Sequence, residues 1–289
     1  MKKTKSERVL IIGGNSSIGI LVENYLKNNK YEVHKTTRRK HEAGKNNLLV
    51  DLKCKQSFSS ITEHYHHAIM LSGITSLEKC ELEPEYTKRV NVDNTIALIK
   101  HLKALGARII YLSTSLVFSD KNVVHAEEFP VDPRTIYGTQ KAEVESYLLG
   151  NRGKDTIIRV SKAISAGNFL LNQWIKQLKN GECIRPFENK YLAPVYSDAV
   201  NFAIESAMSV WNKRIVHVTS SDFISYSELA RKLGDQMKID CKLIKPFLLE
   251  GVNEFMLEFA RLKPSEEMLA AIGPIYSSDT IHKFYQDAK

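Results

Sequence analysis

The sequence predicts an α/β fold built on a doubly wound parallel sheet, with a small C-terminal region interleaved with it. Strand-like apolar runs alternate with helical patterns up to about residue 160. Such alternation is typical of parallel strands joined by right-handed helical crossovers. The 289 residues, of which 43% are hydrophobic, are enough for one large domain or for a domain with a smaller partner.

The first strand is expected over residues 8–12, directly before a glycine-containing turn. Apolar residues from Ile18 to Leu26 then recur at helical spacing. Strand, glycine turn and helix together indicate a dinucleotide site, because the helix N-terminus presents N–H groups to a pyrophosphate. An ordinary strand-to-helix turn is the alternative. The candidate cofactor-binding residues in this turn are Gly13, Ser16, Ser17, Ile18 and Gly19, with Ser16 where the motif usually has its middle glycine.

The second strand, residues 31–37, ends in the basic run Arg38, Arg39 and Lys40. Sites that prefer NAD usually carry an acid here for the ribose 2′-hydroxyl, whereas arginine suits a 2′-phosphate. We see no acid at that place in the sequence. A guanidinium of Arg38 or Arg39 can hold a phosphate through two hydrogen bonds, so the predicted cofactor is NADP. A solvated basic loop is the alternative.

Tyr137 and Lys141 are the most informative pair in the chain. They lie one helical turn apart and follow an apolar strand that ends in Ser113-Thr114-Ser115. A phenol titrates near ~10, and a neighbouring cation is expected to lower its pKa toward neutrality. A hydroxyl from the strand end could hold a carbonyl oxygen beside the phenol. Together these groups are suited to reducing a ketone or oxidising an alcohol. A surface tyrosine and a solvated lysine are the alternative.

At this point the chain resembles the extended short-chain dehydrogenase/reductase family, and within it the dTDP-4-dehydrorhamnose reductases and related sugar-nucleotide-binding proteins. The resemblance covers nearly the whole chain, and it rests on the order and spacing of many segments. These include L49-V-D-L52, H67-A-I-M-L-S-G-I-T75, R89-V-N-V-D-N-T95, I109-I-Y-L-S-T-S-L-V-F118 and F129-P-V-D-P-R-T-I-Y-G-T-Q-K141.

The resemblance implies a Rossmann dinucleotide-binding domain over residues 1–160. Residues 161–289 would be mainly a substrate-binding region, with a segment near 214–219 rejoining the sheet. Asp51 and Leu52 would contact the adenine. Leu71, Ser72 and Gly73 would run beside the cofactor. Thr114, Tyr137 and Lys141 would be catalytic, and Arg185 with Lys190 would face the diphosphate of a nucleotide-sugar substrate.

The activity implied is NADPH-dependent reduction of a 4-keto group on a nucleotide-linked deoxysugar, within polysaccharide or deoxysugar biosynthesis. Ser115 stands where the reductases often carry Asp, and Ser115-Leu116 cannot supply the acid/base pair of the dehydratases, so dehydration is disfavoured. Two alternatives stay open. One is a catalytically idle NADP-binding subunit, such as the regulatory subunit of methionine adenosyltransferase. The other is a nucleotide-sugar epimerase, although such an enzyme would normally prefer NAD.

Composition sets further bounds. The net charge of +8 is not gathered into a basic run longer than Arg38-Arg39-Lys40, so we expect no nucleic-acid partner. We also expect no membrane span, because apolar runs are short. Four scattered cysteines without a C-x-x-C pair argue against zinc and disulfides and for a cytoplasmic location. No metal is expected. The resemblance allows a homodimer, but the oligomeric state stays open. Trp174 is expected in the core of a helix over residues 168–179.

Overall fold

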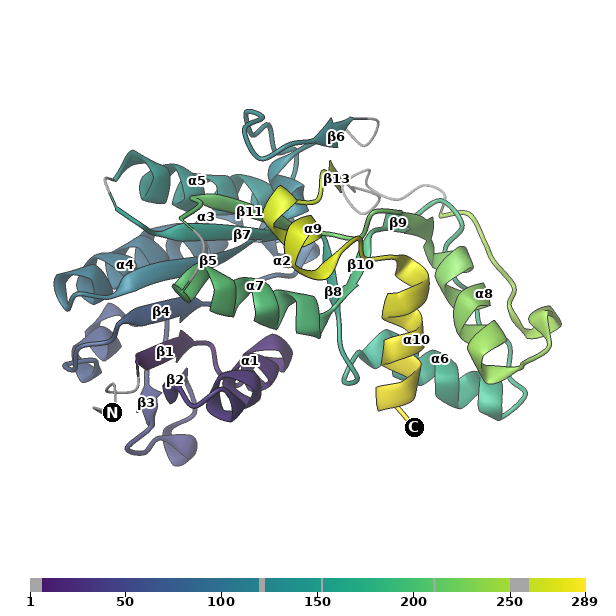
Figure 1. Ribbon diagram of the computed structural model, residues 1–289, viewed down its shortest axis with the longest axis horizontal. Helices are drawn as coiled ribbons and strands as arrows, with labels where there is room; N and C mark the ends of the chain where they lie inside the picture. The colour runs from purple at the N-terminus through teal and green to yellow at the C-terminus, as the bar shows by residue number, and fades with distance from the viewer. Residues whose placement is uncertain (1–6, 120–122, 152, 210–211, 250–259) are drawn as a thin grey trace. The chain divides into compact units, whose positions relative to one another are not determined.

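The computed structural model describes residues 7–119, 123–151, 153–209, 212–249 and 260–289. The chain forms two compact units (Figure 1). The first comprises Met1–Val117, Val131–Arg159 and Asn201–Val216, and the second comprises Phe118–Pro130, Val160–Val200 and His217–Lys289. The short excursion Phe118–Pro130 therefore belongs to the second unit, although it lies within the sequence range that we expected to form the nucleotide-binding domain.

A seven-stranded parallel sheet forms the centre of the first unit, in the order β11-β7-β5-β4-β1-β2-β3, which confirms the predicted doubly wound fold. The strand order runs outward from β1 in both directions. Because the central strands are parallel, their carboxyl ends lie together along one edge of the sheet, which we call the carboxyl edge. The strands are β1 (Arg8–Ile12), β2 (Glu32–Thr37), β3 (Asn47–Leu49), β4 (His67–Met70), β5 (Arg108–Thr114), β7 (Thr156–Val160) and β11 (Ile215–Val218).

Helices cover both faces of this sheet. Leu10 and Ile12 of β1 pack in a core with residues of α4 (Thr95–Ala104) and α5 (Ile136–Gly150). Val9 and Ile11 alternate with them along the strand and are also fully buried, so the opposite face is covered too. The chain continues from β4 into two short helices, α2 (Leu77–Leu82) and α3 (Pro84–Lys88). A π-helical turn at Arg89–Asn94 follows them and leads into α4.

A hydrogen bond joins two further helices within the first unit. Tyr25 of α1 (Ser17–Asn28) donates a 2.7 Å hydrogen bond to Glu205 in α7 (Ser197–Ser209). A buried ion pair fixes α5 to β7, because Arg159 Nη2 lies 2.7 Å from Glu145 Oε2 and both side chains are 2% exposed. Removing one partner of such a pair leaves an uncompensated buried charge, so the two residues lock this helix to its strand.

The second unit has three two-stranded sheets and its own core. The pairs are β10 (Pro194–Tyr196) with β8 (Lys162–Ile164), β12 (Ile224–Ser225) with β9 (Tyr191–Leu192), and β13 (Arg261–Leu262) with β6 (Val124–His125). Trp174 is 6% exposed and lies in this core, as predicted. The helices are α6 (Phe169–Lys179), α8 (Tyr226–Met237), α9 (Glu266–Ile272) and α10 (Ser277–Asp287).

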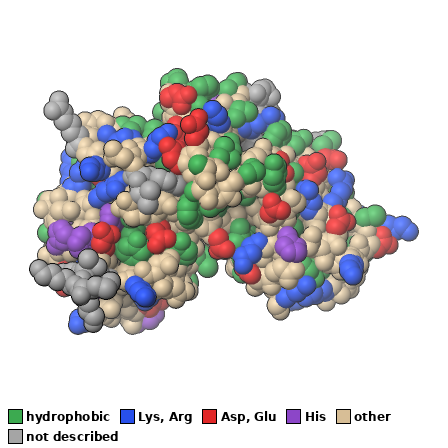
Figure 2. Space-filling view, in the orientation of Figure 1, with side chains coloured by type: hydrophobic (Ala, Val, Ile, Leu, Met, Phe, Trp, Pro, Cys, Tyr) green, Lys and Arg blue, Asp and Glu red, His purple; other side chains and the backbone are tan. Residues whose placement is uncertain are grey.

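Acidic and basic side chains are interspersed on the face drawn in Figure 2, so the positive net charge does not gather there into one patch. Among the residues that the structure describes, no helix is both long and apolar enough to cross a bilayer. The same residues contain no cluster of three or more His, Cys, Asp or Glu side chains placed to hold a metal ion.

Candidate functional site

The turn between β1 and α1 is closed by backbone contacts that only glycine permits. Gly13 has φ +92°, and a Cβ on it would lie 2.4 Å from Oγ of Ser72. A Cβ on Gly19 would lie 2.4 Å from the carbonyl oxygen of Gly13. Ser16 caps α1, because its Oγ accepts a 3.0 Å hydrogen bond from the N–H of Gly19 and donates to the Gly13 carbonyl. The helix therefore starts directly against the end of β1, with its first N–H groups beside the turn.

A cavity of about 340 Å³ opens beside this turn, within the first unit. It joins the glycine turn to the ends of β2 and β4 and to the segment after β3. Ser17, Ile18 and Gly19 belong to the first turn of α1 and do not line the cavity. Of the residues predicted to bind a cofactor, those that line it are Gly13, Ser16, Arg38, Arg39, Asp51, Leu52, Leu71, Ser72 and Gly73.

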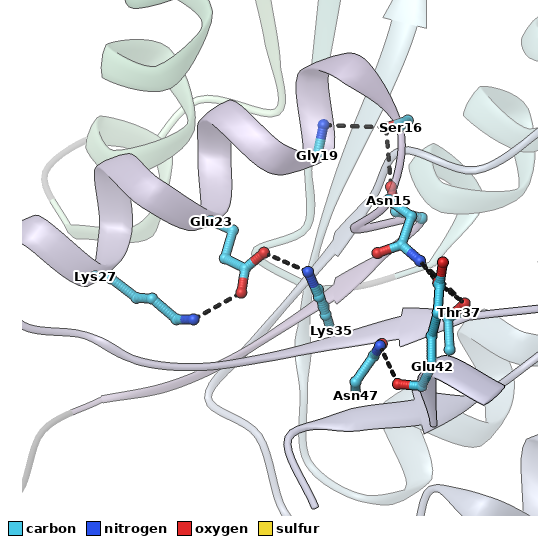
Figure 3. Close-up of polar contacts among 10 residues, drawn as sticks. Asn15, Ser16, Gly19, Glu23, Lys27, Lys35, Thr37, Glu42 and Asn47 are labelled. Atoms are coloured by element: carbon cyan, nitrogen blue, oxygen red, sulfur yellow. Dashed lines mark hydrogen bonds and ion pairs between the residues drawn. The ribbon is translucent and has the colours of Figure 1, made fainter. Parts of the chain in front are cut away.

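The residues directly after β2 are basic, as the sequence indicated, but an acid approaches them from the turn that follows the strand. Glu42 folds back from the turn after the strand and accepts a 2.8 Å hydrogen bond from Oγ1 of Thr37. It also accepts a hydrogen bond from Asn15 in the glycine turn (Figure 3). Arg39 donates a further hydrogen bond of 2.7 Å to the same carboxylate. No pattern in the sequence indicated the place of this acid, because Glu42 lies beyond the strand in a stretch without periodicity.

The predicted catalytic residues lie where a strand end meets a helix start. Thr114 ends β5, and Tyr137 and Lys141 lie in the first two turns of α5. A Cβ on Gly138 would lie 2.0 Å from the carbonyl oxygen of Leu116, so the helix touches the backbone of the turn that follows β5. This contact brings the tyrosine and lysine to the same edge of the sheet as the cavity, since β5 pairs with β4.

The ammonium group of Lys141 is held inside the first unit by neutral partners. Its Nζ donates a 2.8 Å hydrogen bond to the carbonyl of Leu112 and lies 4.5 Å from the ring centroid of Tyr111. Loss of water around this group lowers its pKa to about 8, although the Glu145 carboxylate opposes the shift. The lysine therefore stays largely cationic at neutral pH and loses its proton in mildly alkaline solution.

We expected the charge of Lys141 to lower the pKa of Tyr137, but burial outweighs any such effect and the pKa is raised. Burial raises the pKa of Tyr137 well above its ordinary value, and the nearby Cys80 adds to the shift. Lys141 Nζ lies 5.8 Å from the tyrosine ring centroid and points to other partners, so it does little to stabilise a phenolate. In this state the phenol keeps its proton, which suits a proton donor better than a base.

Hydroxyl groups crowd the end of β5. Thr114 Oγ1 accepts a 3.2 Å hydrogen bond from the N–H of Leu116, which leaves the hydroxyl hydrogen free to be donated. The neighbouring Ser113 Oγ is buried and has no hydrogen-bond partner among the described residues. A buried hydroxyl normally finds a partner, so an unpaired one beside Thr114 marks a place where polar ligand atoms fit.

Sequence reasoning missed the network that supports α5. Asn91 lies in the π-helical turn Arg89–Asn94, accepts a 2.7 Å hydrogen bond from the N–H of Ile74 and donates to its carbonyl at 2.9 Å. It also donates a 2.7 Å hydrogen bond to Gln140, which in turn donates to Thr87 at 2.8 Å. One side chain thus connects the loop after β4 to the helix that carries Tyr137. π-Helical turns recur at functional sites, but no spacing in the sequence indicates one.

The two basic residues predicted to bind substrate lie together in the second unit. The Arg185 guanidinium lies 5.0 Å from the Phe247 ring centroid, and Lys190 Nζ lies 5.7 Å from Phe187 and 5.9 Å from Tyr226. Phe187 and Phe247 contact each other at 5.0 Å, so both cations share one aromatic cluster. Desolvation lowers the pKa of Lys190, and the positive charge of Lys162 lowers it further.

This fold and this arrangement of strand end, glycine turn and Tyr–Lys helix define a class of nucleotide-binding proteins, the extended short-chain dehydrogenase/reductases. The model of the RmlD substrate binding domain family matches residues 7–255, and the chain belongs to that family. The match confirms the resemblance predicted from the sequence.

Individual relatives are distant but cover most of the chain. The spore coat polysaccharide biosynthesis protein SpsK of Bacillus subtilis is 24% identical, over 82% of each chain. The methionine adenosyltransferase 2 subunit beta of Bos taurus is 25% identical, over 96% of this chain and 74% of its own length. The crystal structure of dTDP-4-dehydrorhamnose reductase from Bacillus anthracis in complex with NADP has a TM-score of 0.81 at 20% identity, covering 98% of this chain and 100% of that one.

The contact between Gly138 and Leu116 gives a test of how the helix is placed. We expect Gly138→Ala to lower the free energy of unfolding by about 1–3 kcal/mol, because the added methyl group meets backbone that cannot move aside cheaply. Gly150→Ala is the matched control at the other end of α5, where a Cβ meets nothing within 4 Å. Urea unfolding of the two variants measures the difference. Equal stabilities would show that the close contact does not constrain the helix.

Proposed function

We propose that the protein is an NADPH-dependent oxidoreductase that reduces a keto group on a nucleotide-linked deoxysugar. The observation that carries this proposal is the joint placement of Thr114, Tyr137 and Lys141 at the carboxyl edge of a sheet whose neighbouring strand ends line the cavity. Parallel sheets of this type bind nucleotides at that edge. The name and bound NADP of the Bacillus anthracis structure support the same conclusion.

The residues around the cavity fit a dinucleotide. A side chain at Gly13 would collide with Ser72, and one at Gly19 would collide with the backbone of the turn. The two glycines therefore let the start of α1 lie close to the end of β1, where its N–H groups would meet a pyrophosphate. Arg38 and Arg39 line the same cavity at the end of β2, where a 2′-phosphate of the adenosine ribose would lie. Asp51 and Leu52 would border the adenine, and Leu71 to Gly73 would follow the cofactor toward the catalytic residues. When bound, NADPH supplies the hydride.

The chain's own residues would then manage the proton and the orientation of the substrate. Tyr137 would donate its proton to the oxygen on which negative charge develops. Thr114 would donate a hydrogen bond to the same oxygen and hold it in place. The Lys141 ammonium would exchange its contact with the Leu112 carbonyl for the nicotinamide ribose, and its charge would stabilise the phenolate that Tyr137 becomes. The second unit would contribute Arg185 and Lys190 to the substrate diphosphate.

The catalytic assignment predicts that Tyr137→Phe abolishes turnover and spares NADPH binding. Loss of a general acid costs ~10²–10⁴-fold in rate, and it appears in kcat because the phenol hydrogen is needed only as charge develops on the substrate. Thr114→Ala should lower kcat with a smaller effect on NADPH affinity, whereas Lys141→Ala should weaken both. The measurement is NADPH oxidation with a panel of nucleotide-4-ketosugars.

Tyr147→Phe is the matched control for this experiment, since it removes a phenol oxygen from the same helix outside the proposed site. Equal rates for the unmodified protein and Tyr137→Phe would remove Tyr137 as the acid. Firm NADPH binding without turnover of any ketosugar by the unmodified protein would instead favour a binding subunit. The likeness to the methionine adenosyltransferase beta subunit gives that outcome a precedent.

The cofactor assignment predicts that NADP(H) binds more tightly than NAD(H). A lost hydrogen bond to a charged group costs ~1.5–3 kcal/mol, so changing both Arg38 and Arg39 to Ala should remove most of the preference. Lys40→Ala serves as the control, because Lys40 follows them in the chain and does not line the cavity. Titration calorimetry gives both affinities. Equal affinities in the unmodified protein would overturn the assignment.

The substrate assignment predicts that Arg185→Ala raises KM for the nucleotide-sugar and leaves NADPH affinity unchanged. A charged contact to a phosphate is worth ~1.5–3 kcal/mol, which corresponds to roughly a 10- to 150-fold rise in KM. Arg231→Ala, on the exposed side of α8 in the same unit, is the control. An unchanged KM for every substrate tested would show that Arg185 does not face the diphosphate.

A further inference from the structure

Glu42 does not itself line the cavity, and its side chain is 26% exposed, but it contacts several side chains that do line it. Its carboxylate accepts hydrogen bonds from Asn15 of the glycine turn and Thr37 at the end of β2 (Figure 3). It also accepts one from Arg39 just beyond the strand. All three donors line the cavity. The backbone is fixed as well, since Asn47 donates a 2.7 Å hydrogen bond to the Glu42 carbonyl. The carboxylate therefore has a defined place between two of the elements that would border an adenosine ribose.

Because of this placement, one of the two arginines is paired with a carboxylate and the other is not. Arg39 lies 2.7 Å from Glu42 and is already paired, whereas Arg38 has no side-chain partner among the described residues. The pair is weak, because the Arg39 side chain is 61% exposed and exposed pairs are screened by water and salt. A dianionic phosphate would therefore be able to draw Arg39 away from Glu42, but only against the attraction that now holds it.

The negative charge on Glu42 favours binding of NAD(H) and disfavours binding of NADP(H). The hydrogen bonds from Arg39 and Thr37 hold the pKa of Glu42 below its usual range, so it is ionised at neutral pH. An ionised carboxylate accepts hydrogen bonds from a ribose 2′-hydroxyl, as acids at the end of the second strand do. The same carboxylate repels a 2′-phosphate and competes with it for the guanidinium.

We propose that Glu42 is a specificity-determining residue: it binds the ribose 2′-hydroxyl of NAD(H) and competes with the 2′-phosphate of NADP(H) for Arg39. Glu42 thereby reduces the preference for NADP(H) over NAD(H) that Arg38 and Arg39 would otherwise give. This inference rests on the proposed function, because it requires the cavity to hold the adenosine end of a dinucleotide. A purely structural role is the rival, in which Glu42 only joins the glycine turn to β2.

Glu42→Gln separates the two roles, because the amide is nearly isosteric with the carboxylate and can still accept hydrogen bonds from Asn15 and Thr37. Titration calorimetry of the full chain with NADPH and with NADH is the measurement. We expect NADPH to bind roughly three- to tenfold more tightly and NADH several-fold more weakly, with both effects shrinking at high salt. In an Arg39→Ala background, the gain for NADPH should be smaller, because no guanidinium remains to be released.

Glu32→Gln is the matched control, since Glu32 lies at the opposite end of the same strand and pairs with Arg8 at 2.9 Å. It should change neither affinity. Weakening of both cofactors alike by Glu42→Gln, or no change in NADPH affinity, would overturn the inference and leave the proposed function standing. Failure of the unmodified protein to bind either dinucleotide would overturn the proposed function, and this inference with it.

Discussion

The carbonyl oxygen of Leu116 lies 2.0 Å from the position that a Cβ on Gly138 would take, and this backbone contact determines where the proposed chemistry can occur. Because α5 begins against the turn after β5, Tyr137 and Lys141 reach the end of the strand that carries Thr114. The contact between Gly13 and Gly19 does the same for the start of α1. In both places a glycine, which has no side chain, allows the start of a helix to lie against the end of a strand. The positive end of the α1 dipole and the reactive groups of α5 therefore lie along the same edge of the sheet.

Burial then sets the protonation states at that edge. Desolvation raises the pKa of Tyr137 and lowers that of Lys141 to about 8, so both groups are pushed toward their neutral forms. The lysine keeps its charge at neutral pH because a carbonyl and an aromatic ring receive it. The tyrosine keeps its proton because burial disfavours the charged phenolate. A site in this state is set to donate a proton, and the lysine gains its effect on the phenol only when a ligand draws the ammonium group away from Leu112.

The sequence predicted what depends on local pattern and missed what depends on distant partners. Strand and helix periodicity, the glycine turn and the Y-x-x-x-K spacing are all readable within short windows, and the sheet and the helix starts follow from them. The support from Asn91 to Gln140 crosses 49 positions, and no spacing rule connects a π-helical turn to the catalytic helix. Glu42 was missed for a related reason, since the acid reaches the end of β2 by folding back along a turn. The ammonium group of Lys141 contacts Leu112 and Tyr111 of β5, so the lowering of the Tyr137 pKa that we expected does not outweigh the effect of burial.

The cationic side chains that we propose to contact cofactor or substrate share a further property. Each now contacts a protein group that a bound ligand could replace. Arg39 has an exposed carboxylate, Lys141 has a carbonyl and a ring, and Arg185 lies over the ring of Phe247. Exposed ion pairs and exposed cation–π contacts are worth about 1 kcal/mol or less each, whereas charge-assisted bonds to phosphate are stronger. The partners of Arg39 and Arg185 therefore cost little to replace, while the desolvated contact between Lys141 and Tyr111 is worth about 2 kcal/mol or more. By contrast, the Arg159–Glu145 pair is fully buried and has no competing ligand. Burial separates this pair from Arg39 and Arg185, which are exposed, whereas Lys141 is itself buried and differs from Arg159 in having neutral partners.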